Sequence, residues 1–539
     1  MKKIFLIILT ASVFGAACKK QLDVKNPNEP TPDAATTESG ITSLSQGAVY
    51  INGFKNAKYS DGVFGLFWSG AMGFHELLGD VIGAEAANSF LNQIGCPDKV
   101  TLDNGTVLLN PNNPNKFYDF FRSVNLNDNQ GSNFPYYEWA YMYNMITACN
   151  SVLEILPSVS LSGDAAAKTA TISAWCHFWK GFAYAHIGSV YYAGIINDGI
   201  SGVTNGNYVT KEAVIAESNK QFDLAITDLG SAGGDGYDAI LSKLIPSFCQ
   251  VGKGFPSAAE WIKNINTMKA RNILVNKTVS DMSAADWGAV LALTNAGLTG
   301  EGDSYFTGRT NVNGDFLPTN GTVASRIQSS APGGGGYGLS ERWVQEFKVG
   351  DKRKDNNVKT GTAWLGNSDR GNSFNTRYTL YNEGNGIAGV YVYANTIPEA
   401  FELPLAGSYE ENALMKAEAL INTSQIEAGL QLVDAVRDYF GAGLAHVAGT
   451  NLNLAQAKEE LRRERRVALA FRGLSFYDAR RLKYTEPGVG RTGCVVVDFS
   501  GNVSTNATID YGFLDYWDVP DNELAYNPNT GSTVVKNPK

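Results

Sequence analysis

The 539-residue sequence contains only four histidines, and their positions form no metal-binding pattern. His177 and His186 are nine residues apart in one predicted helix, so they lie on nearly opposite faces and cannot share an ion. His75 is followed by Glu76 but lacks the second histidine of an HExxH zinc motif. A GxSxG nucleophile motif and a phosphate-binding loop are also missing. We therefore expect no metal, no cofactor and no catalytic residue.

Cysteine is scarce as well. Five cysteines follow Cys18, and they are widely scattered, odd in number and without a CxxC pair. This distribution argues against a disulfide framework or a zinc site. We expect Cys96, Cys149, Cys176, Cys249 and Cys494 to be buried as small apolar residues.

Positive charge is limited to 44 Lys and Arg against 53 Asp and Glu, a formal net charge of −9. Only the segment Leu461–Arg466 concentrates basic residues. Binding to nucleic acid requires phosphate contacts gathered on a basic face. We therefore expect no nucleic-acid partner.

Long apolar runs are absent except at the N-terminus, where Lys2 and Lys3 precede the apolar segment Ile4–Leu9 and small residues lead to Cys18. This order is typical of a signal peptide and is too short for a membrane span of about 20 residues. Cysteine after small residues resembles a bacterial lipobox, which implies cleavage before Cys18 and lipid on its sulfur. An ordinary signal peptide cleaved nearby is the alternative. We thus predict a signal peptide over 1–17, a proline-rich tether over 18–35 and one domain over 36–539.

Helical periodicity dominates the rest of the chain and predicts a mainly α fold. Helix pairs that recur every 30–45 residues suggest tetratricopeptide-like repeats with long irregular loops and a few short strands. In the last of these helices, Asn453 is placed to cap the start, with Gln456 in the capping-box position. The predicted helical segments are 38–52, 63–82, 136–156, 164–189, 211–229, 257–276, 283–297, a hairpin over 409–440, and 453–483.

Two stretches, about 85–135 and 297–408, are rich in Gly, Asn and aromatic residues and lack a helical period. A short strand over 389–393 is the clearest element within them. Long irregular stretches in a compact domain are often functional.

Aromatic side chains and planar cations in and beside these stretches are the best candidates for ligand binding. Aromatic faces stack on sugar rings, while a few polar groups bind the hydroxyls. The alternative is that the aromatics pack beneath long loops or contact a partner protein. The candidates are Phe117, Tyr118, Arg122, Phe134, Tyr136, Tyr305, Arg309, Trp343 and Trp364.

The segment Asn125–Gly131 carries several oxygen-bearing side chains that could bind Ca²⁺. The Asp-x-Asp spacing and the closing Glu of a calcium loop are missing, so a solvated turn is the favoured interpretation.

The helix that begins near Leu461 has a distinctive order: Glu464-Arg465, then Ala470-Phe471-Arg472-Gly473, then Phe476-Tyr477-Asp478-Ala479-Arg480-Arg481. This order resembles the signature of the SusD/RagB family of outer-membrane lipoproteins. Leu22–Val24 with Pro27, the segment Ala413–Arg437, and Val519–Pro528 resemble other parts of that family. We expect Glu464, Arg465, Asp478 and Arg480 to pair with neighbouring helices and caps.

The resemblance implies a SusD-like, non-catalytic lipoprotein that is anchored to the outer membrane through the lipid on Cys18 and faces the exterior. It also implies binding of an oligo- or polysaccharide and its delivery to a SusC-like TonB-dependent transporter. Two alternatives remain: a peptide-binding or protein-binding member of the same family, and a surface glycoside hydrolase. The hydrolase stays open because a catalytic carboxylate pair leaves no sequence motif.

Overall fold

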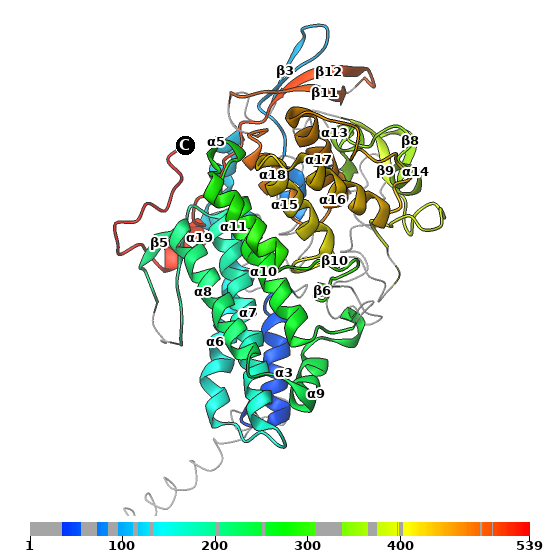
Figure 1. The fold of residues 1–539 in the computed structure, drawn as a ribbon. Helices are drawn as coiled ribbons and strands as arrows, with labels where there is room; N and C mark the ends of the chain where they lie inside the picture. The colour runs from blue at the N-terminus through cyan, green and yellow to red at the C-terminus, as the bar shows by residue number, and fades with distance from the viewer. Residues whose placement is uncertain are drawn as a thin grey trace, which may run out of the picture.

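The helices of this chain form two groups that share one hydrophobic core (Figure 1). The computed structural model describes residues 35–54, 73–84, 95–110, 117–129, 133–200, 204–250, 254–308, 337–364, 375–395, 397, 403–485, 488–498 and 500–539. The larger core cluster includes described residues from Ile41 to Val519. The predicted mainly helical fold with few short strands is confirmed.

Helix α7 (Ala165–Val190) is the centre of the first group and packs against α6 (Pro135–Ile155) and α8 (Lys211–Leu229). Its side chains are buried around most of the helix, including Trp175, Trp179 and Phe182. A helix that is apolar on every side is stable only when neighbours surround it. Here α3 (Glu38–Tyr50) and α9 (Gly234–Leu244) complete that enclosure.

The next helices form hairpins whose starts are set by local caps. Ser257 and Ser283 form capping boxes at α10 (Ala258–Val275) and α11 (Ala284–Asn295). The hairpin of α15 (Tyr409–Asn422) and α16 (Ile426–Tyr439) packs against α10 and α11 around a second small core that contains Trp287 and Met415. These pairs agree with the predicted repeats, and each predicted boundary lies within two residues of the observed one.

The predicted long helix over 453–483 is wrong in its second half. Helix α17 (Leu454–Ala468) begins at the predicted Asn453–Gln456 capping box but ends before Phe471. Phe471 and Gly473 adopt positive φ angles of 67° and 72°, which an α-helix cannot include. A separate helix, α18 (Ser475–Arg481), follows this turn.

The side chain of Glu76 stabilises the turn between α17 and α18. This buried residue belongs to α4 (Gly73–Leu78), and its carboxylate accepts hydrogen bonds from the backbone N–H groups of Phe471 and Gly473 at 3.0 and 2.8 Å. Burial raises the pKa of Glu76 overall, and hydrogen bonds from Ser475 and these two N–H groups offset only part of the increase. Of the predicted helix 63–82, only this C-terminal part lies within the described residues.

The strands are short and lie mainly at one end of the molecule (Figure 1). A four-stranded antiparallel sheet has the order β11 (Arg491–Val497), β12 (Val503–Asp510), β2 (Lys99–Thr101) and β3 (Val107–Leu109). Two-stranded sheets pair β1 (Ile82–Ala84) with β7 (Tyr337–Leu339), and β4 (Ala193–Ile195) with β5 (Tyr208–Thr210). Two more pair β8 (Val358–Trp364) with β9 (Thr376–Leu380), and β6 (Thr307–Gly308) with β10 (Leu403–Pro404).

The stretches predicted as irregular contain more helix than expected. They include α5 (Phe117–Val124), α13 (Glu341–Val344) and α14 (Lys352–Asn357). The predicted strand over 389–393 is absent: Gly389 has a φ of 73° and residues 389–393 belong to no strand. Helix α19 (Asp521–Tyr526) and an extended C-terminal segment complete the described chain.

The described helices include none with both the length and the apolar character of a membrane span. All five described cysteines are buried and none forms a disulfide, which confirms the prediction of small apolar core residues.

Candidate functional site

A hollow of about 410 Å³ lies where the ends of several helices meet the C-terminal segment. This volume is within the range of pockets that bind small ligands. Its walls come from five separate parts of the chain: Tyr192 after α7, the start of α8, the end of α10 with the turn after it, the end of α18 with the residues after it, and residues 513–539. The lining residues are Tyr192, Lys211, Val275, Asn276, Lys277, Thr278, Asp281, Arg480, Arg481, Lys483, Thr485, Phe513, Asp515, Tyr516, Asn537, Pro538 and Lys539.

Arg480 forms the floor of this hollow and closes the ends of two helices. Its guanidinium donates to the backbone carbonyls of Ser189, in the last turn of α7, and Val275, the last residue of α10, both at 2.7 Å. The C-terminal end of a helix carries unpaired carbonyls and a partial negative charge, so a cation is favourable there. A third carbonyl, that of Asp515, accepts at 2.8 Å.

Tyr516 lies between two cations in the wall. The guanidinium of Arg480 is 4.1 Å from the ring centroid, and Nζ of Lys211 is 4.5 Å from it. The Tyr516 hydroxyl donates to Oδ1 of Asn276 at 3.1 Å. Both the ring and its hydroxyl are therefore engaged within the protein.

The C-terminal segment is held in place as the remaining wall. The side chain of Asn537 donates to Oδ1 of Asp515 and to the carbonyl of Tyr516, at 2.7 and 2.8 Å. Burial raises the pKa of Asp515, but hydrogen bonds from Lys539 and Asn537 outweigh it and lower the pKa overall. Arg122 of α5 donates to Asp518 and to the carbonyl of Asn537, which fixes the segment from outside.

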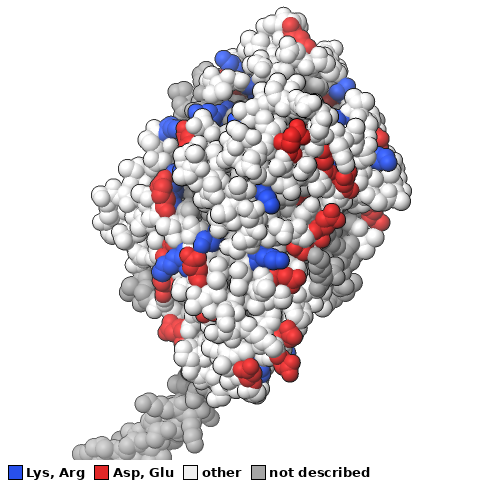
Figure 2. Space-filling model, viewed as in Figure 1, with Lys and Arg blue, Asp and Glu red and all other residues white. Residues whose placement is uncertain are grey.

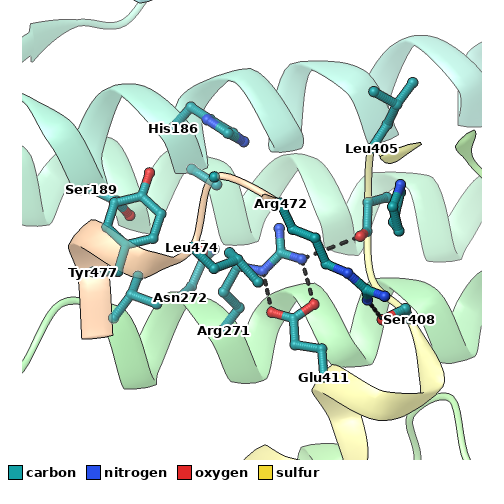
Figure 3. Close-up of a pocket in the computed structure, with 15 residues that line it drawn as sticks. His186, Ser189, Arg271, Asn272, Leu405, Ser408, Glu411, Arg472, Leu474 and Tyr477 are labelled. Carbon is teal, nitrogen blue, oxygen red and sulfur yellow. Dashed lines mark hydrogen bonds and ion pairs between the residues drawn. The ribbon is translucent and has the colours of Figure 1, made fainter. Parts of the chain in front are cut away.

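A second, smaller hollow lies deeper, between α7, α10, α15 and the turn at Gly473 (Figure 3). Its volume is about 20 Å³, enough for about one water molecule. Arg271 donates from Nε and Nη2 to the two carboxylate oxygens of Glu411, both at 2.5 Å, and from Nη2 to the carbonyl of Ala406. Figure 3 shows these side chains pointing toward one another across the hollow, so the space is filled by structural pairs and is too small for a sugar.

His186 borders this inner hollow and belongs to a buried triad. Its Nδ1 lies 2.6 Å from Oε1 of Glu138, and Nε2 of His75 lies 2.7 Å from Oε2. Burial raises the pKa of Glu138, but the two histidines lower it to about 2. The carboxylate is thus ionised and accepts from both rings. The described residues contain no group of three His, Cys, Asp or Glu side chains arranged for a metal ion.

The sequence-predicted ligand residues whose side chains are described do not form one site. Three of them are core residues: Phe134, Tyr305 and Trp343 are at most 1 % exposed. Phe134 packs edge-on against Phe74 and Phe121, and the Trp343 indole N–H donates to the carbonyl of Arg466 at 3.0 Å. The premise that these aromatics lie outside the core is therefore wrong for these three, and their contact with ligand stays an untested prediction.

The other candidates are distributed as follows. Tyr136 is partly buried at the start of α6, and Arg122 pairs with Asp518 at 2.9 Å. Phe117 and Tyr118 belong to α5 and Trp364 to β8, but their side chains lie outside the described part of the chain, as does all of Arg309. Cys18 and the predicted signal peptide and tether also lie outside it, apart from residue 35.

The signature charges are structural, as predicted. Glu464 accepts from Arg353 and Arg437, all within the core, and Arg465 donates to Asp478 at 2.9 and 3.0 Å. Burial raises the pKa of Glu464, but Arg353 and Arg437 outweigh it and lower the pKa. Figure 2 shows acidic and basic side chains interspersed over the visible face, with no continuous basic area.

The segment Asn125–Gly131, for which the sequence favours a solvated turn over a Ca²⁺ site, is hydrogen-bonded to other parts of the chain through its described residues, and Asn125 is buried. Oδ1 of Asn125 accepts from Asn133 and from the backbone N–H of Asp521, and the backbone N–H of Asn127 donates to Asp521. The segment thus anchors α19. Residues 130 and 131 lie outside the described part.

Comparison with known proteins relates the chain to one family. Residues 409–539 match the SusD family. No curated protein matches the sequence. A SusD-like carbohydrate-binding protein from Bacteroides fragilis is 15 % identical, with 92 % of this chain and 99 % of that chain covered and a TM-score of 0.55.

Two further solved structures agree. A SusD homologue from Bacteroides thetaiotaomicron is 14 % identical, covering 83 % of this chain and 88 % of that one, with a TM-score of 0.52. A SusD superfamily protein from Parabacteroides distasonis is 14 % identical, covering 85 % and 96 %, with a TM-score of 0.51. At this identity the likeness establishes the fold, while the family match covers α15 to the C-terminus. Residues 409–539 therefore match the SusD family, and the chain has a SusD-like fold over most of its length.

Proposed function

We propose that this chain is a non-catalytic surface lipoprotein that binds an oligo- or polysaccharide and delivers it to a SusC-like TonB-dependent transporter. The SusD-like fold with its family region is the observation that carries the proposal. The similar Bacteroides fragilis protein is described as carbohydrate-binding, which favours a glycan over a peptide.

The candidate hollow supports a binding role. Its volume of about 410 Å³ accommodates a sugar unit or two, and its lining is mainly polar with tyrosine and lysine side chains. Among the predicted ligand residues, Arg122 of α5 adjoins this hollow, because it donates to the carbonyl of Asn537 in the hollow's C-terminal wall.

The anchor and location belong to the same proposal. Cleavage before Cys18 and lipidation of its sulfur would attach the domain to the outer membrane, through the tether over 18–35, with the domain facing the exterior. More than one acyl chain is needed for stable anchoring. Without a membrane-spanning helix among its described residues, the chain would depend on a partner channel for transport.

The test is a glycan panel screened against purified protein by affinity electrophoresis and calorimetry, with a reducing-end assay on each glycan that binds. We expect binding without release of new reducing ends. Sustained product release would favour the glycoside hydrolase, and binding of peptides alone would favour the peptide-binding alternative. Mild-detergent pull-down from the native membrane tests the transporter, which should co-purify with the chain.

A further inference from the structure

The large hollow differs from the rest of the chain in its charge. Six of its lining residues are cations and two are carboxylates, Asp281 and Asp515, whereas the whole chain has a net charge of −9. The cations are Lys211, Lys277, Arg480, Arg481, Lys483 and Lys539.

The two arginines of this set serve the fold. Arg480 donates to three backbone carbonyls at the ends of α7 and α10 and beside Tyr516. Arg481 is 2 % exposed and pairs with Glu418 and Asp478. Their charge contributes to the potential in the hollow, but their N–H groups already have acceptors.

Three lysines at the rim of the hollow, Lys211, Lys277 and Lys539, are in weaker ion pairs than the two arginines. Nζ of Lys277 is 2.6 Å from Asp286 and Nζ of Lys539 is 2.6 Å from Asp515, and these lysine side chains are 45 % and 55 % exposed. Lys211 is more buried, with its side chain 20 % exposed and its Nζ over the Tyr516 ring, but its carboxylate partner Glu212 is 67 % exposed. Exposed pairs of this kind contribute less than about 1 kcal/mol each. An ammonium group has three donors, so each lysine can accept a second anionic partner at small cost.

The two amide side chains of the wall are already engaged in hydrogen bonds, and the hydroxyl of Thr278 donates to Asp281. Asn276 accepts from the Tyr516 hydroxyl through Oδ1 and donates from Nδ2 to Ser189 and Asn272. Asn537 donates to Asp515 and Tyr516. What the hollow offers a ligand is therefore mainly ammonium N–H donors, which match a charged acceptor better than the hydroxyls of a neutral sugar.

We infer that this hollow binds the carboxylate of an acidic sugar, so that the glycan recognised here contains uronic acid. The inference rests on the proposed glycan-binding function and specifies the chemistry of its ligand. Lys277 and Lys211, on the turn after α10 and at the start of α8, are the residues that contact the carboxylate.

The experiment compares trigalacturonate with its methyl ester, which removes the charges and keeps the sugar rings. Calorimetry uses the chain from residue 19 onward, which retains every described residue. The acid should bind at least about tenfold more tightly than the ester, the size of one charge-assisted hydrogen bond. Raising the salt concentration from 50 to 500 mM should reduce this preference, because the rim is exposed.

Two matched variants localise the effect. Lys277→Gln should weaken trigalacturonate binding about tenfold and leave any ester binding unchanged. Lys269→Gln is the control, because Lys269 belongs to α10 and pairs with Asp223 at the same 2.6 Å but lies outside the hollow. This control should bind like the unmodified protein.

Each other outcome overturns the inference in a distinguishable way. Equal binding of acid and ester, or equal loss in both variants, would show that the rim lysines do not recognise a carboxylate, while glycan binding itself would stand. Binding of neutral glycans alone would do the same. Failure of every glycan in the panel would overturn the proposed function as well.

Discussion

The imidazole of His75 and the carboxylate of Glu138 form a 2.7 Å hydrogen bond that links α4 to α6 inside the core. His186 of α7 binds the second oxygen of the same carboxylate at 2.6 Å. The adjacent residue Glu76 holds the turn between α17 and α18. The short helix α4 thus connects the first helical group to the family region through two consecutive buried side chains.

The triad predicts a loss of stability in acid. Burial lowers the pKa of His186 below 6.5, although the hydrogen bond to Glu138 raises it. The unfolded chain therefore takes up this proton at a higher pH than the folded chain, so stability falls as pH decreases below about 6.5. Glu138, with a pKa lowered from 4.5 to about 2, adds a second loss between those values.

The variant His186→Gln retains an N–H donor for Glu138 and removes the titratable imidazole at position 186. Its melting temperature should change less between pH 7 and 5 than that of the unmodified protein, measured by circular dichroism. Arg271, Tyr477 and Tyr191 also face the triad, and burial raises the pKa of both tyrosines well above its ordinary value, so neither tyrosine titrates in this window. His446→Gln is the control, since its side chain is 61 % exposed. An unchanged slope in His186→Gln would contradict the role of this histidine.

Glu464→Gln should strongly destabilise the protein. Glu464 is 1 % exposed and accepts from both Arg353 and Arg437, so the substitution removes the anion that these two buried guanidinium groups share. Arg353 keeps Asp351 and Arg437 keeps Glu460, so the loss should approach but not exceed the about 3–5 kcal/mol of a fully broken buried pair. Urea denaturation measures this loss.

Glu459→Gln provides the comparison on the same helix. Glu459 pairs with Arg462 but its side chain is 53 % exposed, so the loss should be below about 1 kcal/mol. Equal effects from both substitutions would show that the buried network contributes no more than a surface pair.

Gly473→Ala tests the turn between α17 and α18. Gly473 has a φ of 72°, a conformation that costs an L-residue about 1–2 kcal/mol. Gly288→Ala is the opposite case, because Gly288 lies inside α11 and a Cβ there would meet open space. That change should stabilise the protein by about 0.5–1 kcal/mol. The melting temperature should therefore fall in Gly473→Ala and rise in Gly288→Ala. A shift of both variants in the same direction would contradict the proposed need for glycine at position 473.

The sequence predicted most helices well because their signals are local. The apolar period and a capping residue such as Ser257 or Asn453 lie within the helix itself. The break at Phe471 could not be predicted this way, because its stabilising acceptor, Glu76, is 395 residues away in the sequence. The apolar pattern continues through Phe471 and Leu474, so periodicity alone favours one long helix.

The candidate site was harder to predict for the same reason. Trp343 lies in a stretch without helical period, yet it is buried against Phe471, and its indole N–H donates to the carbonyl of Arg466. The large hollow combines Lys211, Lys277, Arg480 and Tyr516, which are brought together only by the fold. Nothing in the local sequence marks these residues as neighbours.

Arg122 separates a structural role from a ligand-binding role. Its guanidinium donates to Asp518 at 2.9 Å and to the carbonyl of Asn537, and Asp518 also accepts from the backbone N–H of Asn537 at 2.7 Å. The Arg122→Ala variant should therefore loosen the C-terminal segment and cost about 1–2 kcal/mol, since Asp518 is 3 % exposed and loses its charged partner.

Hydrogen exchange is the decisive measurement for this variant, because it reports each segment separately. We expect faster exchange at the backbone N–H groups of Trp517 and Asn537, whose acceptors are Val190 and Asp518. Glycan affinity should fall only through this loosening, so Asp518→Asn, which keeps the arginine, should reduce it as well. Lower affinity in Arg122→Ala with unchanged exchange and full affinity in Asp518→Asn would instead place Arg122 in direct contact with the ligand.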